Sequence, residues 1–127
     1  TRAYDPNTDN KHHSDEKLRK LLVGLLGDKY KLWEGPTVTY QAMLAETQED
    51  VERWSKGGYF GVEMEAATVF AVSNNFKVPA AAMVRITDNL IKNQTVLDVN
   101  FEQGKDMRKQ VSSDMLKAAL VTLINLD

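Results

Sequence analysis

The apolar positions of the chain repeat first at helical spacing and then at strand spacing. Between Ser14 and Gly27, leucines recur every three or four residues, which predicts a helix with Ser14 as its N-cap and its end at Gly27. Residues 30–33 alternate polar and apolar side chains, and residues 37–40 resume an extended run after a Gly-Pro break. Both segments are therefore predicted to be strands.

The middle of the chain alternates short helices with apolar strands. Thr47 and the aspartate three residues later have the spacing of a capping box, which predicts a short helix after Thr47. The glycine-bounded apolar run at 59–62 predicts a buried strand that ends at Glu63, and a helix follows from about Glu65. Residues 80–86 are almost continuously apolar, as expected of a central strand covered on both faces.

A long helix is predicted for residues 101–126, where apolar side chains occupy more than one stripe. The residues expected to face the core are Met107, Val111, Met115, Ala118, Leu120, Leu123 and Ile124. The alternation of strands and helices favours the α/β class. No repeat, low-complexity tract or internal linker divides the chain, so residues 1–127 are predicted to belong to one domain. The predicted strands are few, and the two most apolar ones require neighbouring strands.

Composition narrows the possible classes of function. The chain has 127 residues, with 43% hydrophobic and 27% charged residues, as in globular proteins. The net charge of -2 and the scattered basic residues predict neither a nucleic-acid partner nor binding to an anionic membrane. Without cysteine there is no thiolate metal site, and the adjacent His12 and His13 lack further ligands, so we expect no metal. No apolar run approaches a membrane span and no signal-peptide pattern is present, which predicts a cytoplasmic protein that acts on small ligands.

The strongest candidates for chemistry are two carboxylates in an otherwise apolar stretch, Glu63 and Glu65. An unpaired buried carboxylate is costly, so these groups require cations, backbone donors or a polyhydroxylated ligand. Their predicted place is a strand-to-helix junction, where helix-terminal amides attract oxygen atoms and open α/β sheets bind ligands. A solvated surface pair is the alternative interpretation.

The run Gly-Val-Glu-Met-Glu-Ala-Ala at 61–67, followed by Ile-Thr-Asp-Asn at 86–89, closely resembles the nucleoside phosphorylase and nucleosidase superfamily, of the purine nucleoside phosphorylase and uridine phosphorylase type. The resemblance covers residues 35–90 well and matches only the C-terminal half of family members. It implies a three-layer α/β/α fold with a mixed, largely buried sheet, of which residues 1–127 are the C-terminal portion. The missing N-terminal half and a homo-oligomer are then the expected polypeptide partners.

The resemblance also implies how the ribose is held. Glu65 accepts hydrogen bonds from the 2′- and 3′-hydroxyls, Met64 packs against the apolar face of the sugar, and Glu63 supports this clamp. The implied reaction is cleavage of the N-glycosidic bond of a nucleoside.

A second group of residues is implied for the base. Asp88 matches the position that hydrogen-bonds or protonates a purine ring nitrogen, and Thr87 and Asn89 orient it. To transfer a proton, this carboxyl has to be protonated near neutral pH, which burial favours in general. Met43 and Leu44 fall at positions that are aromatic in the purine-cleaving relatives, or they are simply core residues. Purine specificity is expected, with uridine as the alternative.

The phosphate site of such enzymes lies in the N-terminal half, and between Asp88 and Gly104 the only basic residue is Lys92. These residues therefore do not separate phosphorolysis from hydrolysis. The resemblance makes phosphorolysis to free base and ribose 1-phosphate, with phosphate as co-substrate and no other cofactor, the leading prediction. A hydrolytic nucleosidase and a non-catalytic binding or storage protein of the same fold remain the alternatives.

Overall fold

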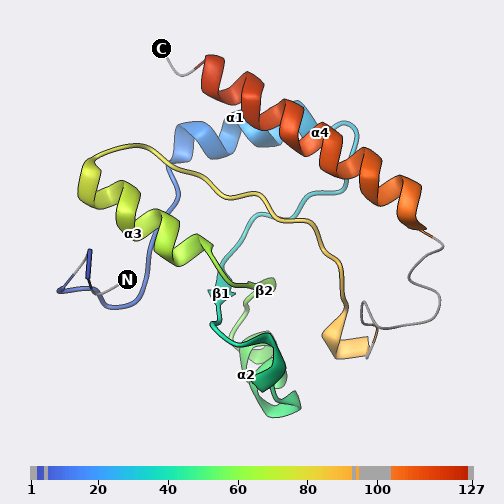
Figure 1. Ribbon diagram of the computed structural model, residues 1–127. Helices are drawn as coiled ribbons and strands as arrows, with labels where there is room; N and C mark the ends of the chain where they lie inside the picture. The colour runs from blue at the N-terminus through green and yellow to red at the C-terminus, as the bar shows by residue number, and fades with distance from the viewer. Residues whose placement is uncertain (1–2, 5, 93, 95–103, 126–127) are drawn as a thin grey trace.

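The computed structural model describes residues 3–4, 6–92, 94 and 104–125. Helices and short strands follow one another along the chain, as expected of the α/β class (Figure 1). In chain order the elements are helix α1 (Glu16–Leu26), strand β1 (Thr37–Thr39), 3-10 helix η1 (Met43–Ala45), helix α2 (Gln48–Lys56), strand β2 (Gly61–Glu63), helix α3 (Ala66–Phe76), 3-10 helix η2 (Leu90–Lys92) and helix α4 (Lys105–Ile124).

Strands β1 and β2 form a two-stranded parallel sheet. Thr39 is paired in register with Glu63, and the amide of Tyr40 donates to the carbonyl of Glu63 at 2.8 Å. The predicted strands at residues 37–40 and 59–62 are thus confirmed, although each observed strand is shorter than its predicted run. In the part of the chain that the structure describes, the sheet contains parallel pairing only, so the mixed and largely buried sheet is not built by these residues alone.

Two predicted strands are wrong for the chain as the structure shows it. Residues 30–33 form no strand, and Leu32 and Trp33 are exposed in the connection after α1. Residues 80–86 run without regular structure, and in this run only the Ala80 carbonyl takes part in backbone pairing with the described residues, accepting from the Asp15 amide at 2.7 Å. The physical reason is that a strand is held by a row of backbone hydrogen bonds to a neighbouring strand, and the described residues form no such row with either segment.

The predicted helix ends are mostly confirmed. The N-cap of α1 is Asp15 rather than Ser14, since its carboxylate accepts from the Leu18 amide at 2.9 Å, and Gly27 is the C-cap. The capping box at the start of α2 is present, with side-chain and backbone bonds in both directions between Thr47 and the aspartate three residues later. Helix α4 spans Lys105–Ile124, and residues 101–103 and 126 of the longer prediction lie outside the described residues.

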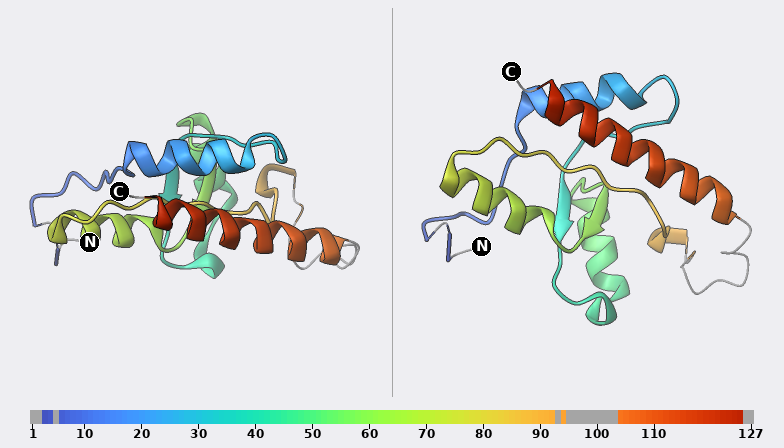
Figure 2. Two further views of the ribbon diagram at one scale, coloured as in Figure 1. Left: turned by 90° about the horizontal axis from the view of Figure 1, so that it is seen from above. Right: turned by 45° about the horizontal axis from the view of Figure 1, so that its top comes forward.

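Helices α1 and α4 pack side by side and form much of the small core (Figure 2). The buried residues of the described chain are Leu18, Leu26, Ala66, Ala71, Ala118 and Thr122. On α4 the prediction holds for Ala118, whereas Met107, Leu120, Leu123 and Ile124 are exposed. Because α1 covers only one stripe of α4, the remaining apolar side chains have no cover among the described residues.

A polar cluster joins α4 to the end of α1. The Asp114 carboxylate accepts hydrogen bonds from the Lys29 ammonium, from the Tyr30 hydroxyl at 2.7 Å and from the Gln110 amide at 3.1 Å. The Lys29 ammonium, followed by the donors of Tyr30 and Gln110, holds the pKa of Asp114 well below its usual range. The ionised carboxylate is therefore a tether between two helices that are far apart in sequence.

We expect Asp114→Asn to lower the free energy of unfolding at neutral pH. Because the pKa of Asp114 is lower in the folded state, its stabilising effect is fully present above the unfolded-state value of about 4 and is lost as pH falls below it. The difference between parent and variant should thus shrink in acid, which urea denaturation from pH 7 to pH 3 measures. Asp28→Asn, at an exposed aspartate next to the cluster, is the control. A gap that stays constant with pH contradicts the tether.

Candidate functional site

The Glu63 carboxylate caps the N-terminus of α3. One of its oxygens accepts hydrogen bonds from the amides of Glu65 at 2.8 Å and Ala66 at 2.6 Å, and the other accepts from the Thr39 hydroxyl. The same Thr39 oxygen accepts from the Ala67 amide at 3.0 Å. The first amides of a helix have no partner within the helix and carry partial positive charge, so a carboxylate at this position stabilises it. Glu63 thus has the backbone donors that its half-buried position requires.

Glu65 and Met64 lie at the same junction and face solvent. Glu65 occupies the N-cap position of α3 without capping it through its side chain, and its carboxylate accepts only from the Met64 amide, at 3.3 Å, among the described residues. The Met64 side chain is 42% exposed. The carboxyl end of β2 therefore presents an accessible carboxylate next to an apolar side chain, and both are attached to backbone that Glu63 and Thr39 hold in place.

We expect Thr39→Val to destabilise the chain by about 1–2 kcal/mol, because it removes the donor to Glu63 and leaves the Ala67 amide without its acceptor. Thr39→Ser keeps the hydroxyl and should recover most of this loss. Chemical denaturation measures the effect, with Thr37→Val on the exposed end of the same strand as the control. Parental stability in Thr39→Val, which keeps the methyl group and lacks the hydroxyl, together with a loss in Thr39→Ser would show that packing of the methyl group, and not the hydroxyl, matters.

Asp88 lies at the far end of the irregular run that follows α3, two residues before η2. The residue is half-buried, and its Oδ1 atom is shielded from solvent without a hydrogen-bond partner in the described structure. Thr87 is exposed, and the Asn89 side chain accepts from the Lys92 amide at 3.2 Å, so it stabilises the η2 turn. A buried carboxylate oxygen requires a hydrogen-bond donor, and for Asp88 no described residue supplies one.

Glu46 is a candidate that the sequence did not suggest. It lies between η1 and α2 and is half-buried. Burial, followed by the negative charges of Asp88 and Asp50, raises the pKa of Glu46. Helix α2 contacts η2, which brings the segment of Glu46 near that of Asp88. In the sequence, Glu46 is only the residue before a helix cap, and this proximity exists only in the folded chain.

The two residues expected at the base are in η1. Leu44 is 95% exposed, so the core interpretation of this side chain is wrong, and the side chain of Met43 lies outside the described residues. The structure thus brings Glu63, Met64 and Glu65 together at the β2–α3 junction and places Asp88 in a second group with Glu46. No hydrogen bond or ion pair links these two groups within the described ranges.

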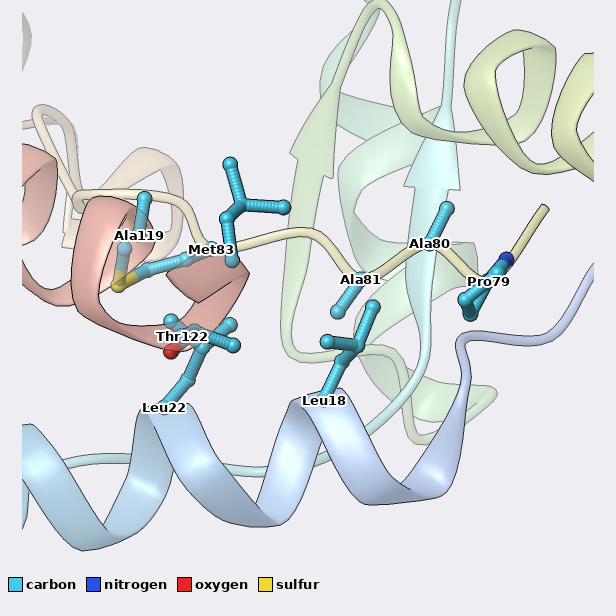
Figure 3. A pocket seen from close by; sticks show the side chains of 9 residues that line it. Leu18, Leu22, Pro79, Ala80, Ala81, Met83, Ala119 and Thr122 are labelled. Atoms are coloured by element: carbon cyan, nitrogen blue, oxygen red, sulfur yellow. The ribbon is translucent and has the colours of Figure 1, made fainter. Parts of the chain in front are cut away.

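A cavity of about 370 Å³ lies elsewhere, between α1, α4 and the run after α3 (Figure 3). Its lining is formed by Leu18, Leu22, Pro79, Ala80, Ala81, Met83, Ala119, Thr122 and Leu123. The predicted site residues do not line it. The described residues contain no cluster of three potential metal-ligating side chains, and none of their helices has the length and apolar character needed to cross a membrane.

Comparison with known proteins adds to this geometry. The family pattern described as the phosphorylase superfamily matches residues 4–124 of the chain. No solved structure matches it significantly.

Three curated relatives illustrate the similarity. A purine nucleoside phosphorylase DeoD-type of Clostridium beijerinckii is 25% identical over 93 residues, which are 73% of this chain and 36% of the relative. A purine nucleoside phosphorylase DeoD-type 2 of Vibrio vulnificus is 32% identical over 75 residues, 59% of this chain and 29% of the relative. A guanosine phosphorylase of Halorubrum lacusprofundi is 35% identical over 71 residues, 55% of this chain and 30% of the relative. The matches span about a third of the length of these relatives.

Proposed function

Because this chain belongs to the phosphorylase superfamily, we propose that it takes part in cleaving the N-glycosidic bond of a nucleoside, with phosphate as the attacking co-substrate. The products are the free base and ribose 1-phosphate. The observation that carries the proposal is the accessible Glu65 carboxylate beside Met64, on a junction that Glu63 and Thr39 hold. Relatives named as purine nucleoside and guanosine phosphorylases support a purine base.

The ribose clamp follows from the chemistry of the bond. As the bond between sugar and base breaks, positive charge develops on the sugar, and groups that bind the sugar more tightly in this state accelerate the reaction. Glu65 accepts hydrogen bonds from the two ribose hydroxyls, and Met64 contacts the apolar face of the ring. Glu63, already bound by three protein donors, acts on the clamp by fixing the backbone of Glu65.

The departing base acquires negative charge, which a donor has to neutralise. Asp88 serves as this donor in our proposal, and its shielded Oδ1 atom has no hydrogen-bond partner among the described residues. Thr87 and Asn89 flank it, and Asn89 does so by fixing the η2 turn. The exposed Leu44 and its neighbour Met43 cover the base from η1.

The proposal includes a companion polypeptide part that carries the phosphate site. The exposed apolar side chains of α4 and the two-stranded sheet support it, since both need further cover to reach the density of a protein core. With that part added, the sheet would be the central layer of a three-layer α/β/α fold. A homo-oligomer and a cytoplasmic location belong to the same proposal.

Turnover assays test the function. The chain is produced alone and together with the part of the Clostridium beijerinckii relative that lies outside the matched 93 residues; we call the second preparation the complemented chain. Adenosine, inosine, guanosine and uridine are offered with and without phosphate. We expect the complemented chain to cleave purine nucleosides only when phosphate is present. Cleavage without phosphate would indicate a nucleosidase, and tight nucleoside binding without cleavage would indicate a binding protein.

A further inference from the structure

The cavity between α1, α4 and the run after α3 contains none of the residues proposed for the reaction (Figure 3). Its volume of about 370 Å³ is within the range of small-molecule sites, which begins at about 300 Å³. Two of its lining residues, Leu18 and Thr122, are only 4% exposed, whereas a third, Leu123, is 59% exposed. The cavity therefore reaches from the core to the surface, so a ligand can enter it.

The Thr122 hydroxyl in this lining is a buried polar group without a partner. In a helix, a threonine hydroxyl commonly donates to the backbone carbonyl three or four residues earlier. The Oγ1 atom of Thr122, by contrast, is shielded from solvent and forms no hydrogen bond with the described residues. Buried polar groups almost always have a partner, because an unpaired one destabilises the folded state. The hydroxyl thus has an unused donor and an unused acceptor in the wall of the cavity.

The other side chains of the lining are apolar and uncharged. They belong to three leucines, three alanines, one proline and one methionine. A charged ligand would lose its hydration in these surroundings and gain no opposite charge. A buried water molecule needs about two to four polar partners, and Thr122 supplies the only polar side chain. The lining therefore favours an uncharged molecule with an apolar body and one hydrogen-bonding oxygen.

We propose that this cavity binds a compact, uncharged small molecule that is apolar except for one hydroxyl or carbonyl group, which forms a hydrogen bond with Thr122. The apolar body contacts Met83 of the run after α3 and Ala119 of α4. A nucleoside does not fit this description, because its ribose and base carry several polar groups and the lining offers one polar side chain. An apolar side chain from another polypeptide would leave the Thr122 hydroxyl unpaired. The ligand is therefore a small molecule other than the nucleoside, and its binding does not depend on nucleoside cleavage.

Three probes of similar size test the cavity in the complemented chain, without nucleoside: benzyl alcohol, toluene and benzoate. Methionine labelled with ¹³C in its methyl group reports where each probe binds, because Met83 lines the cavity and Met64 lies at the β2–α3 junction. We expect the two neutral probes to shift the Met83 methyl resonance and not that of Met64. Benzoate should bind at least about tenfold more weakly than benzyl alcohol because of its charge.

Two results with the probes would overturn the proposal. One is that benzyl alcohol leaves the Met83 resonance unchanged, or that benzoate binds as tightly as benzyl alcohol. The other is that benzyl alcohol shifts the resonance in the chain alone but not in the complemented chain. In that case the companion part itself fills the cavity.

Thr122→Val tests the hydrogen bond, because it removes the hydroxyl and keeps a side chain of similar shape. The variant should bind benzyl alcohol about fivefold or more weakly and toluene at least as tightly as the parent. Since the hydroxyl has no partner among the described residues, urea denaturation should show no loss of stability. Ser113→Ala, which removes an exposed hydroxyl from the same helix, is the control and should change neither affinity. Unchanged binding of benzyl alcohol by Thr122→Val, or an equal loss for both probes, would contradict the assigned role of Thr122.

Discussion

Glu65→Ala is expected to remove nearly all nucleoside turnover by the complemented chain while leaving its fold intact. The Glu65 carboxylate is exposed and accepts only from the adjacent Met64 amide among the described residues, so its loss disturbs little packing. In the proposed reaction it accepts two hydrogen bonds from the ribose. Loss of two charge-assisted bonds costs about 2–4 kcal/mol of transition-state stabilisation, which corresponds to about thirtyfold to eight-hundredfold in kcat/KM.

Steady-state kinetics with inosine and phosphate measures this loss, and circular dichroism checks the fold. Glu49→Ala removes another exposed carboxylate, in the first turn of α2, and should leave turnover unchanged. Turnover at the parental rate in Glu65→Ala would exclude the ribose clamp. A loss of turnover accompanied by a loss of helix signal would show that Glu65 supports the junction rather than the sugar.

Asp88→Asn should slow cleavage in proportion to the need of the base for a proton. The amide can still donate a hydrogen bond but cannot transfer a proton, and general acid catalysis contributes about 100-fold to 10,000-fold. Inosine turnover by the complemented chain should therefore fall about 100-fold or more. With 7-methylguanosine, whose base already carries a positive charge, the loss should stay below about tenfold.

The comparison of the two nucleosides is the measurement that decides the role of Asp88. Equal losses for both would point to a structural role, such as support of the η2 turn. Glu46→Gln is informative in the same assay, because it removes the carboxylate whose pKa responds to the charge of Asp88. We expect this variant to change the pH profile of inosine cleavage more than its maximal rate, because a carboxylate that interacts with the charge of Asp88 is then absent.

Much of the local structure was predictable because its signals lie within a few residues of each other. A leucine stripe that ends at Gly27 predicted α1, and the capping-box spacing after Thr47 predicted α2. Strands β1 and β2 were predictable from short apolar runs, although their ends were not. The N-cap of α1 was misplaced by one residue because Ser14 and Asp15 are both good caps, and only the bond to the Leu18 amide distinguishes them.

Prediction was wrong where the outcome depends on distant partners. Residues 80–86 carry the pattern of a central strand, yet a pattern cannot pair with a neighbour that the described chain does not contain. On α4 the apolar pattern marked Leu120 and Leu123 as core, but burial requires a covering surface, and α1 covers only one side. In both cases the local pattern favours a paired strand or a buried helix face, and the described residues do not provide the partner that this requires.

For the candidate site, the sequence alone determined that carboxylates stand at positions 63 and 65 beside an apolar strand, because alternation and glycine bounds are local properties. Only the tertiary structure decided what each one does. Strand pairing brings Thr39 opposite Glu63, so that carboxylate turns to the helix amides while Glu65 stays accessible. The contact between α2 and η2 likewise brings Glu46 under the influence of Asp88, forty-two residues away in the chain. Hydrogen bonds and charge interactions depend on distance in space, and the fold sets that distance between residues far apart in sequence.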